Sequence, residues 1–181
     1  MEIEIKTDRL LLRPLSLNDT EALHEYYSDE ENTRYVCELP YKDIAETEAY
    51  IRTVTDEMNK AVPHYFVLAI ELNGTVIGNA GVSFDDFFHG TLDCILNKKY
   101  WNRGYGTETL LALKNYLLYE MPDMRAKLLM IRCDYRNKAA ARAAEKIGFK
   151  EQEGGLFRFY RDTGEIIPDL VYGLEIPDDN T

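Results

Sequence analysis

Gly104 and Gly106 stand at the start of a predicted helix, where their type and spacing suit the binding of a phosphate group. The first turn of a helix carries backbone N–H groups without internal partners and a partial positive charge, so it can hold a phosphate or pyrophosphate. Glycines there lack a Cβ, and a ligand can therefore approach the backbone closely. The glycines alone fit an ordinary turn between a strand and a helix equally well. Thr109 stands where the third glycine of a dinucleotide-binding pattern would be, and the Gly-x-x-x-x-Gly-Lys-Ser/Thr pattern is absent.

The elements expected around this turn are a strand before it and a helix after it. Residues 91–96 are mostly apolar and predict the strand. Leu110, Leu113 and Leu117 recur at helical spacing and predict the helix. A strand, a Gly-x-Gly turn and a helix are therefore the expected local structure.

The rest of the chain predicts a mixed α/β fold. Residues 65–72 and 75–84 are apolar runs joined by Asn73-Gly74, a strong hairpin signal, and their near-continuous hydrophobicity indicates a sheet covered on both faces. The other predicted elements are a strand at 10–15 stopped by Pro14, helices at about 16–28 and 43–59, a strand at 127–134, a helix from Asn137 to Gly148, and a hairpin of 149–160 with 165–175. The resulting order is β-αα-βββ-α-β-α-ββ. No linker divides the chain, which predicts a single domain over residues 1–181.

The composition is acidic. The 181 residues carry a formal net charge of −11, and the pI is about 4.8. Such a surface repels nucleic-acid phosphates and anionic lipid, whereas it attracts a cationic amine, a polyamine or a basic protein tail; it equally serves only to keep a protein in solution. The N-terminus lacks the pattern of a signal peptide and no apolar run approaches the length of a membrane span, so a cytoplasmic location is expected.

The cysteines and histidines predict neither a disulfide framework nor a metal site. The cysteines are odd in number, widely spaced and form no Cys-x-x-Cys pair, so all three are expected to be reduced. The histidines show no spacing typical of metal ligands. The residues concerned are Cys37, Cys94, Cys133, His24, His64 and His89.

Three blocks of sequence resemble one family. Tyr-Trp-Asn-Arg-Gly-Tyr-Gly-Thr-Glu at 100–108 resembles the acetyl-CoA pyrophosphate loop of the GNAT N-acetyltransferase superfamily, and most closely its ribosomal-protein N-acetyltransferase branch. The block at 137–149, which runs from Asn137 to Phe149, is similar to that family's Asn-x-x-Ser-x-Arg-x-x-Glu-Lys-x-Gly-Phe helix. Residues 7–15 are similar to the opening strand of the branch. The resemblance implies a single-domain GNAT fold with a mixed, mostly antiparallel central sheet flanked by helices.

The resemblance also implies a reaction and its cofactor. In this family a bound amine attacks the thioester carbonyl of acetyl-CoA directly, which requires an unprotonated amine, donors for the oxyanion and a proton for the departing thiolate. A backbone N–H within Cys94, Ile95 and Leu96 would supply the oxyanion donor, and the same strand would pair along pantetheine. The implied pyrophosphate-binding residues are Asn102, Arg103, Gly104, Tyr105, Gly106 and Thr107.

Further binding residues are implied at two places. Asn137 matches the family residue expected to bond pantetheine, and is equally suited to capping the helix that follows. Arg142 would reach a CoA phosphate, or would be a solvated helix charge. The loop between the first two helices is expected to help wall the acceptor groove, although each of its residues also suits an ordinary loop. The candidates there are Tyr35, Val36, Glu38, Tyr41 and Lys42.

Asp93 is the first candidate for the general base. It is a carboxylate within an apolar strand, shares a strand face with Thr91, and burial would raise its pKa to a useful value. It also suits a solvated position near a strand end. The related enzymes more often have glycine at this position and Glu at that of Thr91, so either Asp93 replaces that carboxylate or water carries the proton. Alanines occupy the helix positions where related enzymes place a Ser or Tyr acid, and Tyr135 is the nearest phenol, although packing is its commoner role.

These observations predict an acetyl-CoA-dependent N-acetyltransferase that acts on a primary amine and needs no metal. The branch resemblance favours the N-terminal amine of a ribosomal or other protein, with a polyamine or aminoglycoside-like amine close behind. The expected partners are acetyl-CoA and this acceptor, without nucleic acid or membrane, and a homodimer is one arrangement considered. The alternative is a non-catalytic acyl-CoA-binding or sensing module on the same fold, which the missing helix hydroxyl leaves open.

Overall fold

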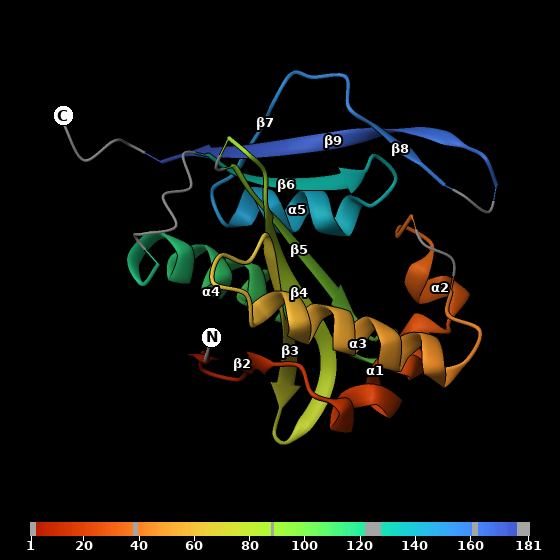
Figure 1. Ribbon diagram of the computed structural model, residues 1–181. Helices are drawn as coiled ribbons and strands as arrows, with labels where there is room; N and C mark the ends of the chain where they lie inside the picture. Colours follow the sequence, from red (N-terminus) through yellow and green to blue (C-terminus); the bar gives the residue numbers. More distant parts are fainter. Residues whose placement is uncertain (1–2, 38–39, 88, 122–127, 161–162, 177–181) are drawn as a thin grey trace.

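A central β-sheet organises the protein, as the computed structural model in Figure 1 shows. The structure describes residues 3–37, 40–87, 89–121, 128–160 and 163–176. Within these residues the strand order is β1-β2-β3-β4-β5-β6-β9-β7, with β8 also paired to β9. All neighbouring pairs are antiparallel except β5 and β6, which are parallel. The strands are β1 (Ile5–Lys6), β2 (Leu11–Pro14), β3 (Tyr65–Leu72), β4 (Thr75–Phe84), β5 (His89–Leu96), β6 (Leu128–Asp134), β7 (Lys150–Glu151), β8 (Phe157–Phe159) and β9 (Ile166–Glu175).

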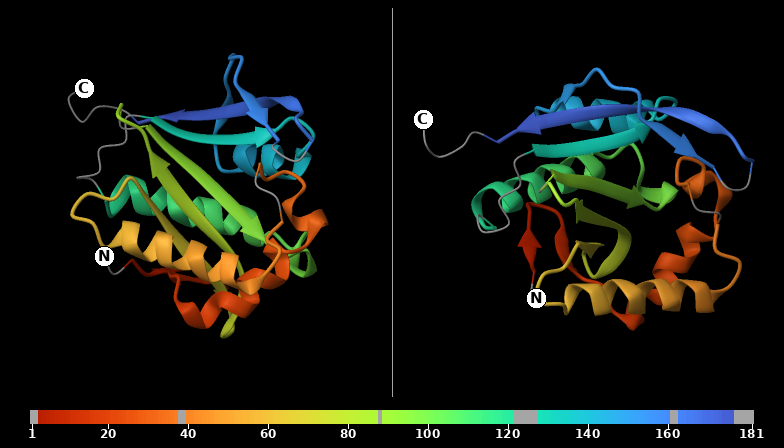
Figure 2. Two further views of the ribbon diagram at one scale, coloured as in Figure 1. Left: turned by 45° about the vertical axis from the view of Figure 1, so that its right-hand side comes forward. Right: turned by 45° about the horizontal axis from the view of Figure 1, so that its top comes forward.

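Helices cover both faces of this sheet (Figures 1 and 2). Helices α1 (Thr20–Tyr27) and α3 (Ile44–Met58) contact strands β4 and β3 on one face, and the short α2 (Glu30–Thr33) lies beside α1. Helices α4 (Tyr105–Tyr119) and α5 (Lys138–Lys146) contact β5, β6 and β9 on the other face. The predicted mixed α/β fold with a mostly antiparallel sheet flanked by helices is confirmed. No helix within the described ranges has the length and apolar character needed to cross a membrane.

Local signals explain where the helices begin and end. Asp43 accepts a hydrogen bond from the N–H of Glu46, while the Glu46 side chain accepts from the N–H of Asp43, so a capping box starts α3. Asn137 accepts from Ala140 N–H at 3.1 Å and caps α5. Gly148, with φ of +92°, follows the end of α5 because a left-handed residue there favours glycine.

The predicted end of a strand at Pro14 is confirmed, since β2 ends there. The structure differs from the sequence prediction at two places. Residues 29–32 were expected only to follow the helix of about 16–28, but the Asp29 carboxylate accepts from the N–H of Asn32 and caps the short helix α2. The C-terminal hairpin contains three strands, since β7 and β8 pair with different parts of β9. Glu38, one of the predicted groove residues, and position 127 of the predicted strand at 127–134 lie outside the described residues.

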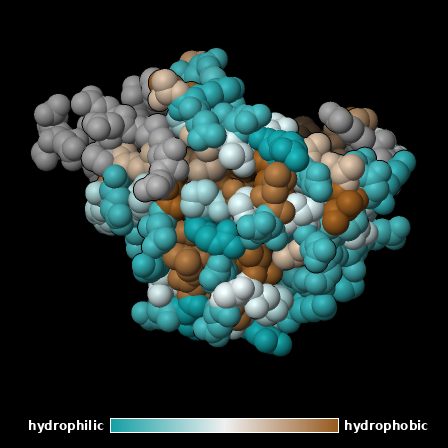
Figure 3. Space-filling view, turned by 60° about the horizontal axis from the view of Figure 1, so that its bottom comes forward, coloured by the Kyte–Doolittle hydropathy of each residue, from teal (hydrophilic) through white to brown (hydrophobic). Residues whose placement is uncertain are grey.

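The surface is predominantly polar. Figure 3 shows one face, on which hydrophobic patches are surrounded by hydrophilic residues. The buried apolar side chains instead lie between the sheet and its helices, with Leu23 and Ile51 on one side and Leu113 on the other. Burial of these side chains from water is the main force that holds the helices against the strands. This packed core supports the loops that follow β5 and β6.

Candidate active site

The glycine turn lies where β5 ends and α4 begins. Two residues of the turn have left-handed backbones, Asn102 with φ of +60° and Gly104 with φ of +83°. Gly104 is the N-cap of α4, so the first N–H groups of the helix follow it directly. Gly106 has no such backbone requirement; a Cβ there would make ordinary contact with the Leu96 side chain at 3.6 Å. Gly104 therefore shapes the turn, whereas position 106 has room for a Cβ.

The carbonyl of Leu96 anchors this turn. It accepts a hydrogen bond from Asn32 Nδ2 at 2.6 Å and another from Trp101 Nε1 at 2.8 Å. Asn32 also accepts from the N–H of Lys98 at 3.1 Å, so α2 is tied to the end of β5 on both sides. Trp101 thus has a specific role in holding the turn. The Leu96 carbonyl is already engaged within the protein, which leaves its N–H as the backbone group of Leu96 for a cofactor.

Strand β5 has one partly unpaired edge. Its register with β6 is recorded from His89 to Leu92, whereas its register with β4 continues to Leu96. Asn97 N–H donates to the Ile77 carbonyl, and backbone groups in an antiparallel ladder alternate in direction. The N–H groups of Cys94 and Leu96 therefore point away from β4, toward the gap that opens between β5 and β6. This geometry favours Cys94 and Leu96 over Ile95 as backbone donors.

Asp93 lies at the start of the same gap. It pairs across the ladder with Gly81 and so lies on the sheet face that α1 and α3 cover. Its side chain remains exposed, yet the surrounding protein displaces much of the water around it. This desolvation raises the pKa of Asp93 to about 6. A carboxylate with such a pKa is largely ionised at neutral pH and still accepts a proton well, as general-base catalysis requires.

Four tyrosines on α1, on α3 and in the loop before α3 gather beside β4, and only Tyr41 among them was predicted as a wall residue. Tyr26 and Tyr27 both donate to Asn79 Oδ1, at 2.8 and 3.1 Å. The rings of Tyr41 and Tyr50 lie 5.2 and 5.4 Å from that of Tyr27. Burial, with smaller effects of neighbours that include Tyr50 and Asp93, raises the pKa of Tyr27. For the other three tyrosines, the sequence signal was an Asn within the apolar strand 75–84.

The other predicted site residues lie around the end of β6 and on α5. Tyr135 follows β6, is 44% exposed, and its N–H donates to the Pro168 carbonyl at 3.3 Å. Asn137 uses its side-chain oxygen as the cap of α5, which leaves its amide N–H groups available for pantetheine. Arg142 is exposed on α5. Among the described residues no hydrogen bond joins Tyr135 to Asp93, and the acid role of Tyr135 stays a prediction.

Two buried carboxylates, one on β6 and one on β9, form ion pairs near the end of β6. Asp134 accepts from Arg136 and from Tyr160 Oη, the latter at 2.7 Å. Asp169 accepts from Arg132 and from Arg158 Nε, at 2.9 and 2.8 Å. Burial opposes the ionisation of Asp134, but the hydrogen bonds from Arg136 and Tyr160 outweigh it and lower the pKa.

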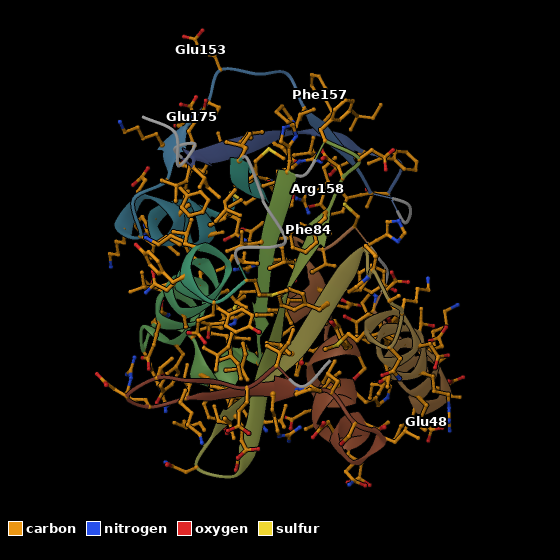
Figure 4. The ribbon with its side chains drawn as sticks, turned by 60° about the vertical axis from the view of Figure 1, so that its left-hand side comes forward. Glu48, Phe84, Glu153, Phe157, Arg158 and Glu175 are labelled. Atoms are coloured by element: carbon orange, nitrogen blue, oxygen red, sulfur yellow. The ribbon has the colours of Figure 1, made fainter. Side chains whose placement is uncertain are left out.

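Arg158 connects this network to the loop after α2. Its Nη1 donates to the Tyr35 carbonyl at 3.2 Å, which ties the C-terminal strands to the loop after α2. Figure 4 shows Arg158 further inside the molecule than its neighbour Phe157. A pocket of about 540 Å³ lies between this loop and the C-terminal strands, with Tyr35, Val36 and Tyr160 among its lining residues. Two of the predicted wall residues, Tyr35 and Val36, thus border a pocket.

The network makes a testable contribution to stability. Tyr160→Phe should lower the free energy of unfolding by about 1.5–3 kcal/mol, because Asp134 loses a hydrogen bond to a buried charge. Urea denaturation would measure this, with Tyr119→Phe as the control since Tyr119 is 76% exposed. The difference should shrink as the pH falls through the lowered pKa of Asp134, because stability from an ionised carboxylate is lost on protonation. Equal stability of both variants would contradict this role.

The described residues contain no group of three or more His, Cys, Asp or Glu side chains that could hold a metal ion. The features that the structure brings together here are a desolvated carboxylate, a partly unpaired strand edge and a helix N-terminus. With the mixed sheet, this is the arrangement that the sequence resemblance led us to expect of a CoA-dependent acyltransferase.

Comparison with known proteins places the chain in one family. Residues 9–150 match the family model described as "Acetyltransferase (GNAT) domain", so the chain belongs to the GNAT acetyltransferases and uses acetyl-CoA. It is 23% identical over 171 residues to the "Uncharacterized N-acetyltransferase p20" of Bacillus licheniformis, which covers 93% of both chains.

Solved structures show the same fold. The GNAT-family acetyltransferase of Bacillus anthracis superposes with a TM-score of 0.79 at 24% identity and covers 96% of this chain and 98% of its own. The microcin C7 self-immunity acetyltransferase MccE, solved with acetyl-CoA and AMP, also has a TM-score of 0.79, at 19% identity and with 94% of both chains covered. The predicted family and acetyl-CoA cofactor are therefore confirmed.

Proposed function

We propose that this acetyltransferase transfers the acetyl group of acetyl-CoA directly to a primary amine, with Asp93 as the general base. The observation that carries the proposal is the position of the Asp93 carboxylate at the start of the gap between β5 and β6, with a pKa raised to about 6. Residues 1–181 would act as one catalytic domain in the cytoplasm, where acetyl-CoA is available.

The residues of the site support each step of the reaction. Asp93 takes a proton from the ammonium group of the acceptor, directly or through water, and the free amine attacks the thioester carbonyl. The N–H of Cys94 on the unpaired edge of β5 stabilises the resulting oxyanion. The tetrahedral intermediate then collapses, the C–S bond breaks, and Tyr135 gives a proton to the CoA thiolate. The nitrogen loses its second proton through water to the Tyr135 phenolate, and Asp93 releases its proton to solvent. The Gly104 turn and the N-terminus of α4 hold the pyrophosphate.

We infer that the acceptor is the N-terminal amine of a protein, of the kind that the ribosomal-protein branch modifies, with a small polyamine as the second candidate. The similarity of residues 100–108 to that branch supports the first. The net charge of −11 supports both, since it attracts cationic acceptors. The pocket between the loop after α2 and the C-terminal strands gives an extended acceptor room to lie.

Calorimetric titration followed by a thiol-release screen tests this function. Acetyl-CoA and desulfo-CoA should bind, whereas NAD should not, because the turn lacks the third glycine of a dinucleotide site. Thiol release is then measured with peptides of different N-terminal residues, polyamines and aminoglycosides. Release with one class of amine would identify the acceptor. Binding of acetyl-CoA without release by any amine would favour the acyl-CoA sensor, and absence of binding would refute the assigned site.

A further inference from the structure

The turn that precedes β2 lies against the start of α4. This turn, residues 7–10, is held by its own hydrogen bonds: Thr7 N–H donates to the Leu10 carbonyl at 2.9 Å, and Leu10 N–H donates to Thr7 Oγ1 at 2.9 Å. Arg9 N–H also donates to Thr7 Oγ1, at 3.3 Å. The turn is therefore a fixed support, although it is far in sequence from the helix that it meets.

Glu108, in the first turn of α4, receives hydrogen bonds from this support. Its Oε1 accepts from Thr7 Oγ1 at 2.6 Å and from Arg9 N–H at 3.2 Å, and its Oε2 accepts from Arg9 Nε at 2.7 Å. Burial opposes the ionisation of Glu108, but the bonds from Thr7 and Arg9 prevail and lower its pKa. Two segments that each resemble a family block, 7–15 and 100–108, are thus joined by direct contacts.

The Arg9 guanidinium extends beyond Glu108 to the glycine turn. Its Nη1 donates to the Arg103 carbonyl at 3.1 Å, and its Cζ lies 4.5 Å from the centre of the Tyr105 ring. Its Nη2 would be 3.4 Å from a Cβ placed on Gly104. The side chain is 45% exposed, and a guanidinium has five N–H groups, so donors are left over for a ligand at the turn.

The charge balance of the turn explains why this contact bears on cofactor binding. An unpaired carboxylate in the first turn of a helix would repel a phosphate placed at that N-terminus. Arg9 neutralises the charge of Glu108 and holds the Arg103 carbonyl by a hydrogen bond. The electrostatic field at the turn then comes mainly from the backbone N–H groups at the start of α4. Arginine is suited to this because its planar fork bonds two oxygens at once.

We propose that Arg9, supported by Thr7 and Glu108, is a positioning residue of the CoA pyrophosphate site: it holds the Arg103-Gly104 turn in its binding shape and offers its remaining donors to the pyrophosphate. This inference rests on the proposed location of the cofactor at that turn. It places part of the cofactor site in the N-terminal segment, where the sequence predicted only a strand.

Binding of two acetyl thioesters to the folded protein tests the proposal. Arg9→Gln should weaken acetyl-CoA binding about 10-fold to 100-fold in calorimetry, the loss expected for charge-assisted hydrogen bonds. The same variant should use S-acetylpantetheine, which lacks the pyrophosphate, with an unchanged kcat/KM. Arg9→Lys should recover only part of the affinity, because an ammonium group keeps the charge but not the fork.

Matched variants separate this role from a general effect on stability. Arg52→Gln removes an arginine whose nearest carboxylate, Glu48, is 3.9 Å away on the surface of α3, and it should bind acetyl-CoA as the unaltered protein does. Figure 4 shows Glu48 at the outer side of that helix. Thr7→Val removes one bond to Glu108, should weaken acetyl-CoA binding less than Arg9→Gln does, and keeps the test available if Arg9→Gln fails to fold.

Two results would overturn the inference: unchanged acetyl-CoA affinity in Arg9→Gln, or an equal loss with acetyl-CoA and S-acetylpantetheine. Failure of the proposed function would look different, since the unaltered protein would then bind acetyl-CoA and release no thiol with any amine. The dependence of acetyl-CoA affinity on ionic strength should also be weaker in Arg9→Gln than in the unaltered protein.

Discussion

Asp93→Asn should lower kcat about 100-fold or more at pH 7, within the range that general-base catalysis contributes, while the affinity for acetyl-CoA stays unchanged. The asparagine side chain keeps the size of Asp93 but cannot accept the proton of the acceptor. Asp86→Asn is the matched control, because it removes an exposed carboxylate near the other end of the same β4–β5 hairpin. A comparable loss in both variants would indicate a charge effect rather than a base.

The pH dependence of the reaction gives a second test of the same residue. With the pKa of Asp93 raised to about 6, kcat/KM of the unaltered protein should rise with pH and level off above that value. Asp93→Asn should lack this rise. Its kcat/KM should instead rise only at the higher pH at which the acceptor amine loses its own proton. An identical profile in both proteins would remove Asp93 from the mechanism.

The same pKa shift predicts the effect on stability. The folded protein disfavours the ionised form of Asp93, because its pKa is raised from 3.8 to about 6. The resulting destabilisation is present above pH 6 and disappears below the unfolded value, where both states are protonated. Asp93→Asn should therefore be no less stable than the unaltered protein at pH 7, so loss of activity cannot be due to unfolding.

Gly104→Val should abolish acetyl-CoA binding in calorimetry without unfolding the protein. A β-branched residue is strained at φ of +83°, and its Cβ would also lie 3.4 Å from Arg9 Nη2. Gly74→Val is a close control, because Gly74 has φ of +80° in the β3–β4 turn and nothing within 4 Å of a Cβ placed there.

The comparison of the two glycine variants separates strain from binding. Both should lose stability through the left-handed backbone, by about 1–2 kcal/mol or more, but only Gly104→Val should lose acetyl-CoA affinity. The ratio of the acetyl-CoA dissociation constants of the two variants therefore measures the effect on binding apart from the effect of backbone strain. Unchanged affinity in Gly104→Val would refute the assignment of this turn to the pyrophosphate.

The sequence predicted most of the strands and helices because their signals are local. The capping box at Asp43 and Glu46, the Asn73-Gly74 turn and the glycine after α5 each specify backbone geometry through neighbouring residues. The helix α2 was missed because its four residues show no apolar period.

The site was predicted less completely, because its missing parts depend on contacts between distant segments. Asn32 looks like a loop residue until β5 ends beside it, and its role on the Leu96 carbonyl has no local signal. Arg9 contacts Glu108 across 99 positions, which no spacing rule connects. Asp93 was recognisable as a carboxylate in an apolar strand, but only the register with Gly81 shows which face it occupies. The chemical type of each site residue could thus be predicted from the sequence, whereas its position relative to the other site residues could not.

The two hydrogen bonds of Asn32, to Leu96 and Lys98, lie between the proposed acceptor pocket and the proposed cofactor edge. Helix α2 leads into the loop that borders the acceptor pocket, and Asn32 on that helix holds Leu96 and Lys98 beside the proposed pantetheine edge. An acceptor that tightens this contact tightens acetyl-CoA binding, and linkage requires acetyl-CoA to tighten acceptor binding by the same factor. Replacement of Asn32 would reduce both factors together, because linkage makes the two factors equal.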